Sequence, residues 1–194
     1  MGSVREAQKR ETEARVLTVA DELFRTRGFT VTTIRDIATA AGVSTGTVMS
    51  AGDKNALLVA SFDQRIEEIH QGRAECRAES ASGAIEQIAE LVEPFAELFT
   101  ADPQLARVYG SILVAGETAS STFTELADTL INEVEAVLVR AQVQVARPLA
   151  ESIYFAYIGR LFTWTPQDDH NTEQLKRSLK GIIAAICQTR KSQA

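Results

Sequence analysis

The chain has 194 residues, of which 45% are hydrophobic and 24% charged, a composition typical of a globular protein with one or two domains. It contains no run of about 20 apolar residues that would span a membrane, and its charged N-terminus lacks the apolar core of a secretory signal. We therefore expect a cytoplasmic protein without a membrane partner.

The net charge of −6 is unevenly distributed. Residues 1–58 hold eight basic and seven acidic side chains, a net charge of +1, so the rest of the chain carries −7. An acidic protein is an unusual partner for nucleic acid. The asymmetry nevertheless leaves the N-terminal part able to bind DNA.

Apolar residues recur at helical spacing, and no segment has a convincing strand pattern, so we predict an all-α fold of about nine helices. Pro94 falls inside one apolar run, and we expect a kink or break there near Leu91. The predicted helices cover about 5–26, 33–42, a short segment from 44, 53–79, 83–100, 103–116, 121–144, 148–165 and 172–191.

Residues 33–49 have the pattern of two short helices that cross at a tight turn. The second helix of the chain begins after Thr32 or Thr33, either of which is a suitable N-cap, and Gly42 supplies the positive φ that the turn needs. The exposed start of the next helix is the end that meets base edges in helix-turn-helix proteins. It carries Ser44, Thr45 and Thr47. The stretch therefore predicts DNA binding.

Residues 14–58 resemble the DNA-binding domain of TetR-family regulators. The matching features are Ala20, Leu23-Phe24, Gly28-Phe29, Thr32-Thr33, Asp36-Ile37-Ala38, Ala41-Gly42-Val43-Ser44, Gly46-Thr47-Val48, Lys54 and Leu57-Leu58. The remaining helical length is similar to the family's C-terminal domain in architecture only. The resemblance implies an N-terminal three-helix DNA-binding domain over 1–52 and a helical ligand-binding and dimerisation domain over 53–194.

The resemblance also implies roles for single residues. Thr33 would cap its helix and touch a phosphate, Arg35 would reach a base or a phosphate, and Lys54 would contact phosphate as a point charge. Arg35 and Lys54 could instead be solvated surface charges, and Thr33 and Ser44 are N-caps in either case. The groove-lining residues would be Thr45, Gly46 and Thr47, with Gly46 allowing close approach of the backbone.

The end of the second short helix departs from the family pattern. Met49 stands where the family usually has tyrosine, and the turn after it, 50–53, is one residue shorter and has no aromatic residue. A phosphate-binding hydroxyl is therefore missing, and Ser50 is expected to replace it. The complete predicted DNA-binding set is Thr33, Arg35, Ser44, Thr45, Gly46, Thr47, Met49, Ser50 and Lys54. The basic residues Arg5, Lys9 and Arg10 alternate with glutamates and are interpreted as a solvated face.

We expect a homodimer on a palindromic operator, because one helix-turn-helix makes too few contacts for specific binding. The apolar stripes of the last two helices would form a four-helix bundle between two chains, or would only close the core of one chain. The predicted interface comprises Ile153, Tyr157, Arg160, Leu161, Leu175, Leu179, Ile182, Ile183 and Ile186.

The C-terminal helices are also expected to hold a small effector. Aromatic side chains are the candidate lining, although each could be ordinary core. They are Phe95, Phe99, Tyr109, Phe123, Tyr154 and Trp164. No buried charged cluster is evident, so we predict an apolar or aromatic effector whose binding releases the operator, which makes the protein a repressor.

No enzyme, metal site or cofactor is predicted. Glu67 and His70 form one i, i+3 pair, whereas a di-iron bundle needs two such motifs and two further glutamates. Neither cysteine lies in a zinc-binding pattern. The alternative function is that of a protein–protein adaptor that keeps the fold and has lost sequence-specific DNA binding, and only the shortened turn supports it.

Overall fold

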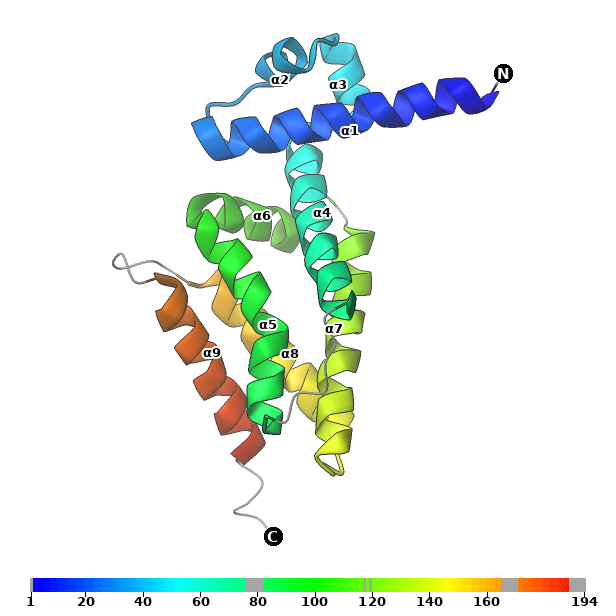
Figure 1. The fold of residues 1–194 in the computed structure, drawn as a ribbon. Coiled ribbons are helices and arrows are strands. Elements are labelled where there is room, and N and C mark those ends of the chain that lie inside the picture. The colour runs from blue at the N-terminus through cyan, green and yellow to red at the C-terminus, as the bar shows by residue number, and fades with distance from the viewer. Residues whose placement is uncertain (1, 76–81, 117, 119, 165–170, 189–194) are drawn as a thin grey trace. The chain divides into compact units, whose positions relative to one another are not determined.

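The computed structural model describes residues 2–75, 82–116, 118, 120–164 and 171–188 (Figure 1). Its described residues form helices and connections without strands, which confirms the all-α prediction. The helices are α1 (Gly2–Arg27), α2 (Ile34–Ala41), α3 (Thr45–Ala51), α4 (Lys54–Glu75), α5 (Ala84–Ala101), α6 (Pro103–Ala115), α7 (Ser121–Arg140), α8 (Ala146–Phe162) and α9 (Asn171–Gln188). Pro94 lies inside α5, which continues past it, so the chain has no break near Leu91.

The chain divides into two compact units that do not follow chain order. The first comprises Met1–Arg65 and Gln104–Ser120, and the second comprises Ile66–Pro103 and Ser121–Ala194. Helix α4 contributes to both units. The division at residues 52 and 53 into a DNA-binding and a ligand-binding part stays a functional prediction.

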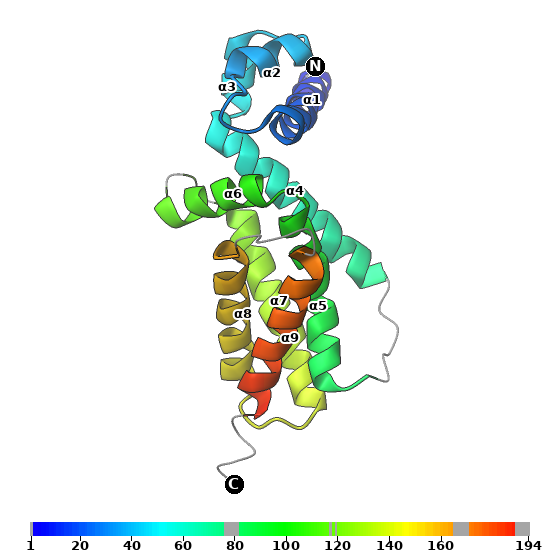
Figure 2. The same cartoon turned by 90° about the vertical axis from the view of Figure 1, so that its left-hand side faces the viewer.

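In the first unit, α2 and α3 pack against α1, which Figure 2 shows almost end-on. Phe24, Ile37 and Val48 supply one fully buried side chain from each of these helices. Burying such a side chain contributes about 1.5–3 kcal/mol relative to leaving it in water. These contacts hold the two short helices in place.

Helix α6 joins the first unit through Tyr109. Its ring stacks on Phe62 of α4 with the ring centroids 4.4 Å apart. Its hydroxyl donates a hydrogen bond to Asp63 over 3.1 Å, and the Ser120 hydroxyl donates to the same carboxylate over 2.6 Å. Burial raises the pKa of Asp63, while these two hydrogen bonds act in the opposite direction.

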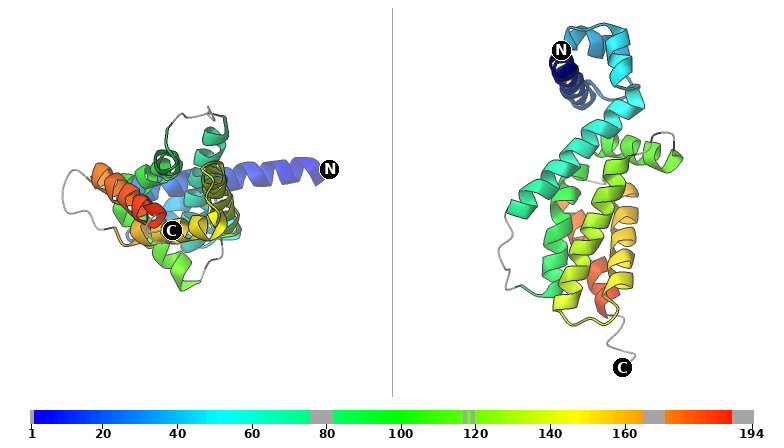
Figure 3. Two further views of the ribbon diagram at one scale, coloured as in Figure 1. Left: turned by 90° about the horizontal axis from the view of Figure 1, so that it is seen from below. Right: turned by 90° about the vertical axis from the view of Figure 1, so that its right-hand side faces the viewer.

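The second unit is a helical bundle in which α7 lies between α5 and α8 (Figure 3). Helix α9 packs on α5 and α8. The fully buried large aliphatic side chains of the unit are Ile88, Leu138, Ile153, Leu175 and Ile183. No helix among the described residues is long and apolar enough to cross a bilayer.

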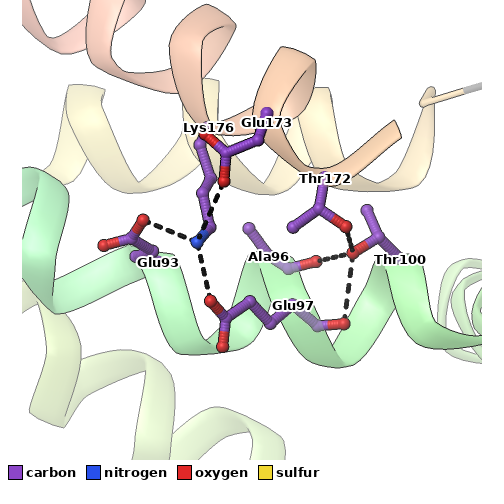
Figure 4. Close-up of polar contacts among 7 residues, drawn as sticks. All are labelled: Glu93, Ala96, Glu97, Thr100, Thr172, Glu173 and Lys176. Carbon is purple, nitrogen blue, oxygen red and sulfur yellow. Dashed lines mark hydrogen bonds and ion pairs between the residues drawn. The ribbon is translucent and has the colours of Figure 1, made fainter. Parts of the chain in front are cut away.

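A lysine on α9 connects that helix to α5 (Figure 4). This lysine is Lys176, and only 19% of its side chain is exposed. Its ammonium lies 2.7 Å from the carboxylate of Glu93 and 2.6 Å from that of Glu97. Hydrogen bonds to these two carboxylates raise the pKa of Lys176. Beside this cluster, the hydroxyls of Thr100 and Thr172 lie 2.8 Å apart. The polar contacts therefore reinforce the apolar packing of α9.

We expect Lys176→Met to lower the free energy of unfolding by about 1–2 kcal/mol. The substitution keeps the apolar stem but leaves Glu93 and Glu97 as like charges one helical turn apart. The matched control is Lys180→Met, because Lys180 is 52% exposed and, among the described residues, pairs with Glu86 alone. That change should cost less than about 0.5 kcal/mol. If urea denaturation shows the same loss in the free energy of unfolding for both variants, Lys176 does not stabilise the packing of α9 on α5 through its ion pairs.

Candidate nucleic-acid interface and ligand cavity

Thr33, not Thr32, caps α2. The Thr33 hydroxyl accepts from the Asp36 backbone N–H over 3.2 Å and donates to the Asp36 carboxylate over 2.6 Å. These contacts, with the Thr33 N–H to Asp36, form a capping box and hold the pKa of Asp36 below its usual value. A phosphate oxygen only accepts hydrogen bonds, so Thr33 would have to release Asp36 to donate to one. Thr32 is buried and donates to Gly28 over 2.8 Å.

The turn between α2 and α3 has the geometry that the sequence indicates. Gly42 has φ +67°, and the Val43 N–H donates to the carbonyl of Ala38 over 3.0 Å. Ser44 caps α3, because its side chain accepts from the Thr47 N–H over 3.0 Å. The first turn of α3 is thereby fixed at its N-terminal end.

The surface of α3 is largely free to meet a partner. Thr45 and Gly46 are exposed, and Met49 is 52% exposed. The Ser50 hydroxyl donates to the carbonyl of Thr47 over 2.8 Å. A Cβ added at Gly46 would meet only Ser44 Oγ at 3.7 Å, so nothing inside the described chain requires glycine there.

The two predicted basic contacts differ in how they are held. Arg35 is exposed and forms no ion pair with any described residue. Lys54 instead donates to the carbonyl of Thr30 over 3.3 Å, and its ammonium lies 4.3 Å from the ring centroid of Phe29. Partial burial lowers the pKa of Lys54. Lys54 thus also anchors the connection between α1 and α2, whereas Arg35 has no such structural task.

Basic residues of α1 lie beside α3, which the sequence analysis did not expect. A groove of about 280 Å³ is lined by both helices. Its lining includes Arg5, Lys9, Thr12, Thr47 and Ser50. The sequence could have indicated this position for Arg5 and Lys9. Residues 5, 9, 12 and 16 share one face of the helix, and Val16 on that face is buried.

The second unit contains a small cavity between α4, α5, α7 and α8. Its free volume is about 30 Å³. Three of the predicted pocket residues, Phe95, Phe99 and Tyr154, line it together with His70 and Tyr157, which the prediction had not placed there. The side chain of Phe123 lies outside the described part of the structure.

The other two predicted pocket residues lie elsewhere. Tyr109 is buried in the first unit, where it stacks on Phe62. Trp164 is buried beneath Arg160, whose guanidinium carbon lies 4.5 Å from the ring centroid. Neither lines the cavity between α4, α5, α7 and α8.

Most residues of the predicted dimer interface contribute to the core of the single chain. The buried ones are Ile153, Tyr157, Leu161, Leu175, Leu179 and Ile183. Arg160, Ile182 and Ile186 are half-buried, and Phe155 on α8 is 68% exposed. The apolar stripes therefore close this chain's own bundle, and the dimer stays a prediction.

Comparison with known proteins identifies the N-terminal segment. Residues 16–60 match the model of the family described as bacterial regulatory proteins, tetR family. This segment is the DNA-binding segment of a TetR-family regulator. The matched residues contain α2, the turn and α3 in full, so the protein is a DNA-binding transcriptional regulator. None of the curated proteins compared matches the chain.

Solved structures agree with the fold over most of the chain. The Thermus thermophilus repressor FadR, in complex with lauroyl-CoA, is 22% identical with a TM-score of 0.65, over 92% of this chain and 94% of its own. A regulator from Saccharomonospora viridis in complex with choline is 20% identical with a TM-score of 0.61, over 90% and 96%. The Bacillus subtilis FadR, in complex with stearoyl-CoA, is 18% identical with a TM-score of 0.58, over 88% and 96%.

We expect Gly46→Ala to separate DNA binding from folding. Stability should be unchanged or higher by up to about 1 kcal/mol, because alanine favours helix and its Cβ has room. Affinity for operator DNA should fall by about tenfold or more if the α3 backbone enters the groove, since one displaced base contact is worth about 1–3 kcal/mol.

Gly72→Ala is the matched control, because Gly72 is an exposed glycine of α4 with equal room for a Cβ. Fluorescence anisotropy with labelled operator and thermal melts measure the two effects. If both variants bind DNA like the original chain, α3 does not approach DNA at Gly46.

Proposed function

We propose that this regulator is a homodimeric repressor that releases its operator when a small, largely apolar effector binds in the cavity of the second unit. The DNA-binding part of this proposal rests on one observation: the turn between α2 and α3 is fixed by hydrogen bonds, while polar groups beside it are exposed. The capping contacts of Thr33 and Ser44 fix α2 and α3, while Arg35, Thr45 and Gly46 stay exposed.

Phosphate contacts from α1 complete the proposed DNA interface. The chain lacks the tyrosine that the family usually carries at position 49, and Arg5 and Lys9 line the same groove as Ser50. Lys9 lies 3.6 Å from Glu13, whereas Arg5 has no ion pair with a described residue. We assign to Arg5 the role of a backbone contact that positions α3 without reading sequence.

The proposed dimer would use the outer faces of α8 and α9. Phe155 supports this surface, because a ring that is 68% exposed is a favourable anchor for a partner. The half-buried Ile182 and Ile186 of α9 extend the apolar part. A second copy would bring a second helix-turn-helix to the other half of a palindromic site.

The proposed release follows from the size of the cavity. A volume of about 30 Å³ is far below the roughly 300–1,000 Å³ of a typical ligand pocket, so an effector must move the lining helices apart. An effector that fits only the expanded state shifts the protein toward that state. A difference in affinity of about 1–3 kcal/mol between the two states is a typical coupling energy.

Operator binding tests this function against the adaptor alternative. We expect Arg35→Ala to reduce affinity for the DNA upstream of the regulator's own gene by about 1–3 kcal/mol, because Arg35 is exposed and forms no ion pair with a described residue. The control is Arg177→Ala, which removes an equally exposed arginine from α9. No salt-sensitive, sequence-selective binding by the original chain would favour the adaptor.

The contribution of α1 is tested by comparing Arg5→Ala with Arg10→Ala. Both arginines are exposed on α1, but only Arg5 lines the groove with α3. Arg5→Ala should flatten the plot of log affinity against log salt concentration by about 0.9 for each subunit, or roughly 1.8 for the dimer, without changing sequence preference. Arg10→Ala should leave the slope unchanged, and identical slopes for the two variants would remove Arg5 from the interface.

A further inference from the structure

The cavity between α4, α5, α7 and α8 has an apolar lining with a polar end that nothing in the chain explains. Tyr157 lines it and is only 3% exposed. Its hydroxyl forms no hydrogen bond with another described residue. Its ring contacts that of Tyr154 with centroids 6.5 Å apart. A tyrosine hydroxyl at the edge of an apolar cavity can donate a hydrogen bond to a ligand when the fold does not engage it.

A guanidinium next to the same cavity is also only partly satisfied. Arg73 of α4 pairs through Nη2 with Glu133 of α7, and 14% of its side chain is exposed. Its other terminal nitrogen, Nη1, is buried and has no partner among the described residues. This pair is the buried charged cluster that the sequence did not reveal, because the two residues are far apart along the chain.

Arg73 and the cavity share one aromatic ring. The guanidinium carbon of Arg73 lies 5.4 Å from the ring centroid of Phe95, and the imidazole of His70 lies 5.0 Å from the same centroid. Both Phe95 and His70 line the cavity. Burial raises the pKa of Tyr157 well above its usual value. The charge of Arg73 is close enough to Tyr157 to act on this pKa in the opposite direction. Tyr157 therefore keeps its proton and is available as a donor.

We propose that the effector carries a carboxylate on an apolar body, and that this carboxylate accepts hydrogen bonds from the Tyr157 hydroxyl and from Nη1 of Arg73. The inference rests on the proposed function, in which the cavity binds an effector. Two unsatisfied donors match a head group that has two oxygens and only accepts. An uncharged alcohol offers one oxygen and no charge to the guanidinium. The apolar remainder of the lining fits a hydrocarbon body, so this inference amends the apolar effector expected from the sequence.

The test compares acids with alcohols of equal length. The full chain is titrated calorimetrically, without DNA, with hexanoate, octanoate, decanoate and 4-phenylbutyrate, and with the corresponding alcohols. At least one acid should bind about tenfold or more tightly than its alcohol, because a hydrogen bond to a charged group is stronger than a neutral one. If no acid in the series binds better than its alcohol, the inference is overturned.

Tyr157→Phe should weaken binding of the preferred acid by about ten- to a hundredfold. Its melting temperature should stay close to that of the original chain, because the hydroxyl forms no hydrogen bond with another described residue. Tyr109→Phe is the matched control, since the Tyr109 hydroxyl donates to Asp63 in the other unit, and it should leave the acid's affinity within about twofold. Arg73→Lys keeps a charge for Glu133, removes Nη1 and should weaken the acid more than its alcohol. Equal effects of Tyr157→Phe and Tyr109→Phe on acid binding would overturn the inference.

Operator release is measured separately by anisotropy with the same compounds. If an acid binds through Tyr157 and Arg73 but leaves the operator complex intact, the carboxylate site is supported and the proposed release is wrong. If no acid binds and a different compound releases the operator, the carboxylate inference is wrong while the proposed repressor function stands.

Discussion

The left-handed backbone of Gly42 determines how α2 and α3 cross, and the residues of these two helices that are proposed to meet DNA depend on that crossing. At φ +67°, a side chain at this position would be strained even though a Cβ would have room. Ile37 and Val48, both fully buried, hold the helices on either side of the turn. The position of the exposed Thr45 and Gly46 is therefore a consequence of packing that takes place beneath them.

Polar side chains with a structural role and those with a proposed functional role differ in how many of their hydrogen bonds and ion pairs the fold supplies. Thr33, Ser44 and Lys176 engage neighbouring groups and fix helix ends or contacts between helices. Arg35 is exposed and forms no ion pair with a described residue, and Nη1 of Arg73 has no hydrogen-bonding partner among them. A polar group that the fold leaves unmatched is a candidate for contact with something outside the chain. The proposed DNA interface and the proposed carboxylate site rest on this same physical contrast.

In the proposed function, the small volume of the cavity is what would let the second unit sense a ligand. Because close-packed interiors resist gradual deformation, an occupant much larger than about 30 Å³ requires a different arrangement of the helices around it. Helix α4 supplies both His70 of the lining and Lys54, which contacts the connection between α1 and α2. One continuous helix thus supplies residues to both proposed sites.

The sequence alone determined the helices, the turn at Gly42 and the DNA-binding segment, because helical periodicity, capping residues and a required positive φ are local properties. Tertiary structure decided what depends on residues distant in sequence. It placed Tyr109 against Phe62 and away from the cavity, and it paired Arg73 with Glu133. It also buried Leu175 and Leu179 within this chain's own core. An apolar stripe shows that a helix face is covered, but only the folded chain shows whether its own helices or another molecule cover it.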